Sequence, residues 1–268
     1  MNDEQRTSTR IALFGDIHLY SLRLWPWHLL SKRVLGQTNL WLNRRKRFSR
    51  QLVRQVTERI DSIAPDAVLC PGDLTTTATH TEFRMARHAL ADTFARFPTF
   101  ITPGNHDRYT FAAARHGRFE QYFGEQSARQ WPIHHALSDN VDLIAIDTAR
   151  PNRIFDKGRV GQSQREAMKR LIGAVPDDHH LIVMGHYTIG TPPGFKPEKR
   201  HHALIDEAEL IDALAAAERP MFYLHGHVHK PWCWRHPLAT NVTVVNAGSP
   251  THVDHHFPRG QGIWQIEL

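Results

Sequence analysis

The chain has 268 residues, of which 41% are hydrophobic and 22% are charged, a balance typical of soluble globular proteins. Its formal net charge is +6, but residues 22–48 contribute seven positive charges and no negative one, so the other residues sum to −1. The basic character is therefore local, and the composition argues against a general nucleic-acid-binding surface.

The termini and the cysteines exclude further classes of protein. No run of 18 apolar residues occurs, so we expect no transmembrane helix. The first ten residues, MNDEQRTSTR, contain acids and no apolar core, so they do not predict a secretory signal. The only two cysteines, Cys70 and Cys233, do not make a disulfide framework, and a reducing cytoplasm is the expected compartment.

Five short apolar runs, each ending in a glycine-containing turn, predict buried strands. In chain order they are IALFG (11–15), DAVLCPG (66–72), TFITPG (99–104), LIVMG (181–185) and MFYLHG (221–226). A hairpin is predicted over residues 133–147, with Asp139-Asn140 at its turn. The C-terminal runs NVTVVNAGSP and GIWQIEL predict two more strands.

Helical patterns lie between these strands. An apolar stripe from Phe48 to Ile63 ends before Pro65, and a second from Phe83 to Phe97 ends before Pro98. Residues 162–175 and 206–218 predict two more helices. Because strands and helices alternate, we expect an α/β architecture with layered sheets. Without repeats, low-complexity segments or composition shifts, residues 1–268 are expected to form a single domain.

Polar side chains follow the five apolar runs. In open α/β sheets, ligands bind beyond the carboxyl ends of the strands, so these side chains are expected to converge. Their mixed nitrogen and oxygen donors suit Mn, Fe, Zn or Co, and the absence of a CxxC motif argues against a thiolate zinc site. The candidates are Asp16, His18, Asp73, Asn105, His106, Asp107, His186, His227 and His229.

Each of these short motifs alone is a weak signal. Gly-His-x-His and Asp-x-His are brief, and a Gly-Asp pair at a strand end is most often a turn or a helix cap. Together they carry more weight, because all five stand directly after predicted strands. In this order GDIH, PGDL, PGNHD, the isolated GH and HGHVH resemble the calcineurin-like metallophosphoesterases, as do the last strands with the NAGSP turn.

The resemblance implies a four-layer α/β/β/α fold, in which two packed mixed sheets are flanked by helices. It also implies a binuclear centre of two metal ions, drawn from Mn²⁺, Fe²⁺/Fe³⁺, Zn²⁺ or Co²⁺. By matched position, Asp73 would bridge the two ions. The first ion would be held by Asp16, His18 and His229, and the second by Asn105, His186 and His227.

The same resemblance implies a reaction. A metal-bridged hydroxide would attack the phosphorus of a phosphodiester or phosphoanhydride in a small phosphorylated substrate. His106 would act as a general acid or stabilise developing charge, and Asp107 would hold its other ring nitrogen. The motif style is similar to bacterial class III cyclic-nucleotide phosphodiesterases and glycerophosphodiesterases.

Three alternatives remain open at this point. Hydrolysis of a lipid-linked or nucleotide-sugar pyrophosphate is suggested by the Trp- and Arg-rich residues 22–48. A catalytically silent scaffold is disfavoured, because all seven candidate ligands and His106 are present. A nuclease would need a long basic groove with stacking aromatics, which only residues 22–48 offer, so nucleic acid is not the expected partner.

Some residues depart from the family pattern or lie outside it. The fourth block reads MGHYTIGTPPG, with its prolines displaced, which puts the loop wall near the second metal in question. His225 is an extra histidine that we interpret as structural or as orienting a ligand. Arg150 and Asn152 are candidates for phosphate contact, with a solvated loop as the alternative. His252, His255 and His256 either face the substrate or lie on the surface.

Residues 20–48 predict a basic, Trp-rich, cap-like insertion that leaves the first strand beside Asp16 and His18. Pro26 would open a short helix and Gly36 would close it, and a longer helix would then run on to Ile63. Either the apolar face packs on the core, or the segment caps the substrate entrance. Whether residues 22–48 also contact an anionic membrane is a separate open question, and such a contact would place this cytoplasmic protein peripherally at the inner face of the membrane.

Overall fold

The computed structural model describes residues 8–21, 48–49, 51–153, 155–196 and 201–268. The predicted cap-like insertion therefore lies almost entirely outside the described residues, as does its short first helix, whereas the longer helix is described from Gln51 onward. Within the described ranges, no helix combines the length and the apolar character needed to cross a membrane.

The first sheet has four strands in the order β10-β1-β2-β3. β1 (Arg10–Leu13), β2 (Ala67–Cys70) and β3 (Thr99–Ile101) are parallel, and β10 (Trp264–Glu267) pairs antiparallel with β1. The three parallel strands are the first three apolar runs of the sequence. Because they are parallel, their carboxyl ends lie at one edge of the sheet.

The second sheet has six strands in the order β4-β5-β6-β7-β9-β8. At its centre β5 (Val141–Ala145), β6 (His180–Met184), β7 (Met221–His225) and β9 (Val242–Asn246) are parallel. The edge strands β4 (Ile133–Ser138) and β8 (Trp232–Arg235) are antiparallel to their neighbours. The predicted hairpin is confirmed as the β4–β5 pair.

Side-chain alternation in the strands separates two faces of each sheet. Ile11 and Leu13 of β1 pack with Leu143 and Ile182 of the second sheet, whereas Ala12 packs on the opposite side, toward the helices. The two sheets therefore share a core and lie face to face. Apolar residues on both faces of each parallel strand explain why these strands appear as continuous apolar runs.

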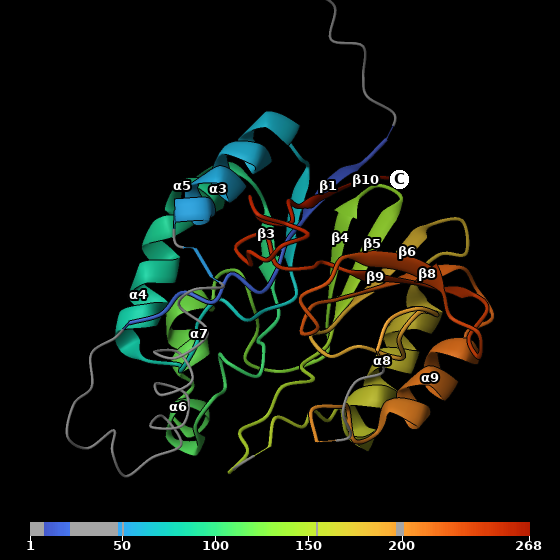
Figure 1. Ribbon diagram of the computed structural model, residues 1–268. Helices are drawn as coiled ribbons and strands as arrows, with labels where there is room; N and C mark the ends of the chain where they lie inside the picture. Colours follow the sequence, from blue (N-terminus) through green and yellow to red (C-terminus); the bar gives the residue numbers. More distant parts are fainter. Residues whose placement is uncertain (1–7, 22–47, 50, 154, 197–200) are drawn as a thin grey trace, which may run out of the picture.

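Helices cover the two outer faces, which completes four layers (Figure 1). Against the first sheet lie α3 (Gln51–Ile63), α4 (His80–Ala89), α5 (Ala91–Arg96), α6 (Phe111–Arg115) and α7 (Arg118–Phe123). Against the second lie α8 (Gln162–Ala174) and α9 (Glu207–Ala215). The predicted four-layer α/β/β/α fold, two packed mixed sheets flanked by helices, is confirmed.

Two helix predictions were wrong in detail. The first helix begins at Gln51, and Phe48 instead forms an isolated bridge with His252. The stripe from Phe83 to Phe97 is divided between α4 and α5, with Leu90 between them. In both cases the apolar spacing is satisfied because all these residues face the core, although the backbone is not one continuous helix.

Candidate metal centre

The five loops after β1, β2, β3, β6 and β7 bring the predicted polar residues together where the two sheets meet. Five of the seven candidate ligands have positive φ angles, a region that residues other than glycine rarely adopt. Such backbone strain persists only where the surroundings hold it, and it is typical of functional sites. The five are Asp16 (52°), His18 (45°), Asp73 (57°), His227 (73°) and His229 (56°).

Two glycines explain why the ligands can approach so closely. A Cβ on Gly104 would lie 2.1 Å from Oδ1 of Asp73, and a Cβ on Gly226 would lie 2.3 Å from Oδ2 of Asp16. Both distances are far shorter than any real contact, so no other residue fits at either position. The glycine before Asn105 and the glycine before His227 therefore make room for carboxylates from other loops.

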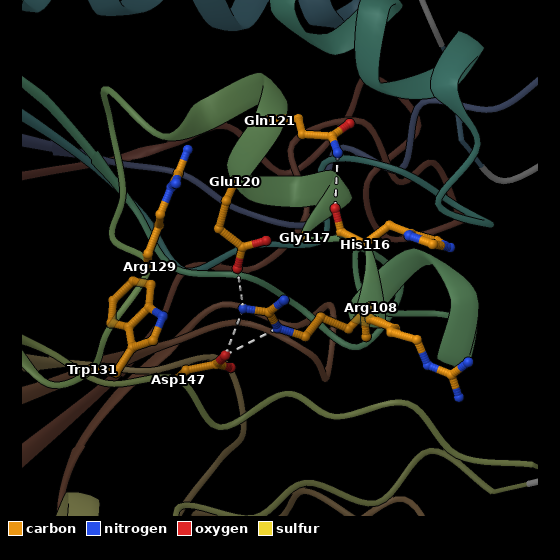
Figure 2. A pocket seen from close by; sticks show the side chains of 10 residues that line it. Arg108, His116, Gly117, Glu120, Gln121, Arg129, Trp131 and Asp147 are labelled. Carbon is orange, nitrogen blue, oxygen red and sulfur yellow. Dashed lines mark hydrogen bonds and ion pairs between the residues drawn. The ribbon is translucent and has the colours of Figure 1, made fainter.

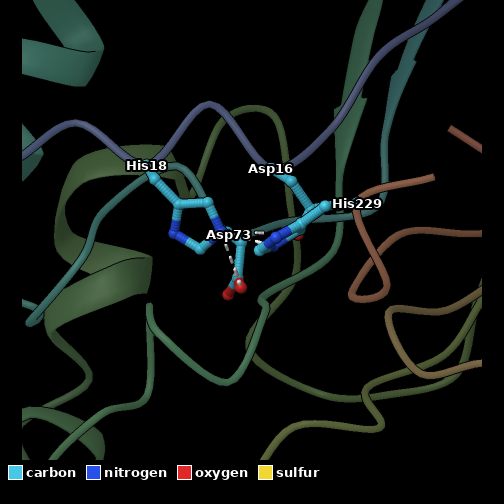
Figure 3. A group of neighbouring side chains, drawn as sticks. All are labelled: Asp16, His18, Asp73 and His229. Carbon is cyan, nitrogen blue, oxygen red and sulfur yellow. Dashed lines mark hydrogen bonds and ion pairs between the residues drawn. The ribbon is translucent and has the colours of Figure 1, made fainter. Parts of the chain in front are cut away.

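The first subsite contains Asp16, His18, Asp73 and His229, which point toward one another in Figure 3. One potential ligand atom from each lies within 4.8 Å of the others. Nε2 of His18 and Nε2 of His229 are 2.8 Å apart, and they lie 3.7 and 3.4 Å from Oδ1 of Asp16. Two imidazole nitrogens and two carboxylates in this arrangement fit a transition-metal cation.

The second subsite is built around Asn105. Its Oδ1 lies 2.9 Å from Nε2 of His186 and 2.9 Å from Nδ1 of His227. Oδ2 of Asp73 lies 3.5 Å from Nε2 of His186 and 3.5 Å from Nε2 of His18. Asp73 is thus positioned between the two subsites, where a bridging carboxylate would stand.

Backbone carbonyls fix the orientation of the histidine rings. Nδ1 of His186 lies 2.7 Å from the carbonyl of Pro71, which leaves Nε2 toward the site. His227 is turned the other way, because its Nε2 lies 3.0 Å from the carbonyl of His202 and its Nδ1 faces Asn105. Such outer hydrogen bonds select the tautomer that presents a lone pair to a metal.

Burial and charge keep these groups in ligand form. Burial raises the pKa of Asp16. Hydrogen bonding and charge interaction with His229, with smaller contributions from His186 and His227, together lower this pKa by a larger amount, so the net shift is downward. Burial lowers the pKa of His186 to about 3. Asp16 is therefore anionic and His186 neutral near pH 7, which are the forms that bind a cation.

Comparison with known proteins agrees with this geometry. The family model for the calcineurin-like phosphoesterases matches residues 9–231, most of the chain. The chain belongs to the calcineurin-like phosphoesterase family.

Curated relatives of this calcineurin-like phosphoesterase include a probable glycerophosphodiester phosphodiesterase, GpdQ, from Arcobacter nitrofigilis, which is 24% identical over 193 residues. That match covers 70% of this chain and 64% of the relative. The 3',5'-cyclic adenosine monophosphate phosphodiesterase CpdA of Haemophilus influenzae is 24% identical over 154 residues, covering 55% of this chain and 51% of the relative. The chain thus spans between half and two thirds of the length of these relatives.

Solved structures share the fold at low sequence identity. A dimetal phosphatase from Danio rerio superposes with a TM-score of 0.64 at 9% identity, covering 96% of this chain and 91% of the other. A purple acid phosphatase from yellow lupin superposes with a TM-score of 0.62 at 14% identity, covering 98% and 50%. At these identities the likeness supports the fold of the calcineurin-like phosphoesterase alone.

One predicted contact in this phosphoesterase was wrong. Asp107 was expected to hold a ring nitrogen of His106, but Nδ1 of His106 lies 2.6 Å from the carbonyl of Thr76. The carboxylate of Asp107 instead accepts hydrogen bonds from four backbone N–H groups, those of Asp73, Leu74, Thr75 and Gly104. Because these groups occupy both of its oxygens, Asp107 ties the loop after β2 to the loop after β3 instead of holding the His106 ring.

The structure also places several other residues that the sequence singled out. His225 is buried, and its Nδ1 lies 2.9 Å from the carbonyl of Gly226, in agreement with a structural role. Arg150 and Asn152 both donate to the carbonyl of Lys157, which shapes their own loop. His252 lies beside the centre, with its ring centroid 6.0 Å from that of His229.

The sequence pattern did not identify Phe48 as part of the site. Its ring packs edge-on against His18, with centroids 4.6 Å apart, and against His229, with centroids 5.4 Å apart. Only 4% of Phe48 is exposed. Its helical spacing with Leu52 and Val56 concealed this role, because an aromatic residue before a helix gives no separate signal.

Proposed function

We propose that this chain is a metal-dependent phosphodiesterase that hydrolyses a small phosphorylated substrate at the candidate metal centre. The observation that carries the proposal is the position of Asp73, whose Oδ2 lies 3.5 Å from a histidine nitrogen of each subsite. A carboxylate between two groups of donors suits a pair of cations. The named activities of both curated relatives, which are phosphodiesterases, support the reaction class.

Asp16, His18 and His229 would hold the first ion, and Asn105, His186 and His227 the second, with Asp73 shared. The nitrogen and oxygen donors suit Mn²⁺, Fe²⁺/Fe³⁺, Zn²⁺ or Co²⁺. Bound ions of this kind supply Lewis acidity toward phosphate oxygens and lower the pKa of nearby water. The chain's own residues then provide the orientation: backbone carbonyls fix the rings of His186 and His227, and Phe48 packs edge-on against those of His18 and His229.

His106 is the residue that we propose to handle a proton. Its Nδ1 faces the Thr76 carbonyl, so Nδ1 carries hydrogen and Nε2 is the nitrogen that can exchange a proton. Its backbone N–H donates to Oδ1 of Asp73, which places it against the bridging carboxylate. From there His106 would protonate the leaving-group oxygen or stabilise its negative charge.

Two earlier ideas receive no support from the described residues. The lipid-linked pyrophosphate alternative and the membrane contact both rested on residues 22–48, which lie outside the described ranges apart from Phe48. The cytoplasmic location stays a prediction. The substrate that we propose is a phosphodiester with a small organic group on each side of phosphorus.

The proposal is tested by hydrolysis of bis-p-nitrophenyl phosphate in the presence of Mn²⁺. The wild-type chain should release p-nitrophenol, and Asp73→Asn should lose this activity because it removes the shared carboxylate. Asp92→Asn, an exposed carboxylate in α5, is the matched control and should keep it. Undiminished turnover by Asp73→Asn would overturn the proposal.

A further inference from the structure

Apart from the candidate metal centre, a cavity lies between α7 and the segment that follows β5 (Figure 2). Its volume is about 610 Å³, within the range of about 300–1,000 Å³ that is typical of small-molecule sites. None of the seven candidate metal ligands lines it. Its lining includes Arg108, Arg115, Glu120, Arg129, Trp131 and Asp147.

The base of this cavity carries a compact charge network. The Arg108 guanidinium donates through Nη2 to Oε1 of Glu120 at 2.5 Å and through Nε to Oδ2 of Asp147 at 3.0 Å. The three side chains are only 10–15% exposed. Burial lowers the pKa of Arg108, but the two carboxylates together raise it by a larger amount, so the guanidinium stays cationic. Both acids of the lining are therefore committed to Arg108.

The other two arginines that line the cavity differ from Arg108 in having no carboxylate partner among the described residues. Arg115, at the end of α6, and Arg129, before β4, are both exposed. Within the described part of the chain, neither guanidinium has a hydrogen bond or an ion pair. With the two carboxylates already bound by Arg108, these two guanidinium groups make the wall electropositive. Guanidinium groups in this state favour phosphate, which they bind with paired hydrogen bonds.

Trp131 gives the cavity an aromatic wall. Its side chain packs against the core between the two sheets while also lining the cavity, so the ring is held in place. In Figure 2 it lies on the same side of Arg108 as Arg129. A fixed indole beside an unpaired guanidinium is suited to a ligand that combines a flat ring with an anionic group.

We propose that this cavity binds an organic phosphate that carries a flat ring, with its phosphate on Arg129 and its ring against Trp131. The inference does not depend on the proposed phosphodiesterase activity. It has a structural connection to the metal centre, because Arg108 directly follows Asp107. Asp147 directly precedes Thr148, whose Oγ1 accepts a hydrogen bond from the backbone N–H of His186.

The test is isothermal titration calorimetry of the full chain with AMP as the probe. Wild type should bind AMP, and the variant Arg129→Gln should bind it at least tenfold more weakly, because the phosphate loses its charged partner. The matched control is Arg84→Gln, which removes an exposed helix arginine outside the cavity and should leave the affinity unchanged. Equal affinity in these two variants would overturn the proposal.

Two further arms identify the site and the ligand class. Asp73→Asn disables the metal centre and should keep AMP binding; loss of binding in this variant would place the probe at the metals and overturn the inference. On unaltered protein, AMP should bind about tenfold more tightly than glycerol 3-phosphate or inorganic phosphate, because only AMP has a ring to stack. Equal affinities for the three ligands would refute the proposed contact between the ring and Trp131. Because this readout is binding, failure of the phosphodiesterase proposal would leave it unaffected.

Discussion

His106 lies beside the candidate ligands, with its ring centroid 4.9 Å from that of His18, but it is not one of the converging metal-binding groups. We predict that His106→Gln lowers kcat by about 10²–10⁴-fold, the usual contribution of a general acid or base, while bound Mn²⁺ stays at the wild-type level. Activity and elemental analysis on the same samples check this. His180→Gln, an exposed histidine on β6, is the control. Loss of metal from His106→Gln would instead make His106 a ligand.

Asp142 on β5 holds two histidines, with Oδ1 2.5 Å from Nε2 of His134 and Oδ2 2.7 Å from Nδ1 of His179. Burial raises the pKa of Asp142, but the interactions with these two histidines together lower it by a larger amount, so the net pKa lies below 3.8. The folded-state pKa is thus below that of the unfolded chain. The stabilisation is therefore present above pH 3.8 and is lost as the pH falls through the lowered pKa.

We predict that Asp142→Asn lowers the free energy of unfolding by roughly 2 kcal/mol at pH 7, the scale of hydrogen bonds to a charged group. At pH 3 the difference from wild type should be clearly smaller. Urea unfolding at the two pH values measures it, with the exposed turn residue Asp139→Asn as the control. An equal difference at both pH values would refute the assignment to ionised Asp142.

At this scale the sequence predicts which residue types converge but not which atoms they present. The order of the motifs placed all seven candidate ligands near one another, and the structure brings them together. The order of the motifs could not predict that His186 presents Nε2 and His227 presents Nδ1, because that choice depends on the carbonyls of Pro71 and His202. Backbone carbonyls carry no residue signature, which is also why Asp107 rather than Thr76 was expected at His106.

Among the elements, α4 has the clearest local determinant of its start. The hydroxyl of Thr79 accepts a hydrogen bond from the N–H of Glu82, and the side chain of Glu82 accepts one from the N–H of Thr79. We predict that Thr79→Ala lowers the free energy of unfolding by about 1 kcal/mol, whereas Thr79→Ser stays within a few tenths. Chemical denaturation of both variants measures this. A serine variant as unstable as the alanine variant would argue against the capping contribution.

The elements that the sequence missed are short or irregular. α6 and α7 have five and six residues, and β8 has four, so none provides enough turns or alternations for a periodic signal. The long helices α3 and α8 and the central strands were predicted because burial imposes the pattern over many residues. The interruption between α4 and α5 was missed because the apolar stripe continues across Leu90.

At the scale of the molecule, Arg108 connects the two halves of the fold. It follows the loop after β3 and binds Glu120 of α7 and Asp147 beyond β5. We predict that Arg108→Gln lowers the free energy of unfolding by about 3 kcal/mol, because two carboxylates would stay buried without their cation. Arg54→Gln, from the exposed pair with Glu58, should cost less than about 1 kcal/mol. Similar losses in both variants would refute this distinction.

The overall architecture could be predicted from alternating strands and helices together with the family resemblance. The arrangement of the candidate metal centre across both sheets could not be predicted in detail. Asn105 comes from the first sheet, whereas His186 and His227 come from the second, so the second subsite exists only when the halves are packed. Long-range packing of this kind has no local signal, and the cap-like insertion lies outside the described residues.

The proposed binuclear centre is tested most directly by counting bound metal. After equilibrium dialysis against Mn²⁺, elemental analysis of the wild-type chain should give two ions per chain. Asn105→Ala removes a ligand from the second subsite alone and should leave one ion, held by Asp16, His18, Asp73 and His229. A wild-type chain with one ion, or an Asn105→Ala variant that still holds two, would contradict the two-subsite arrangement.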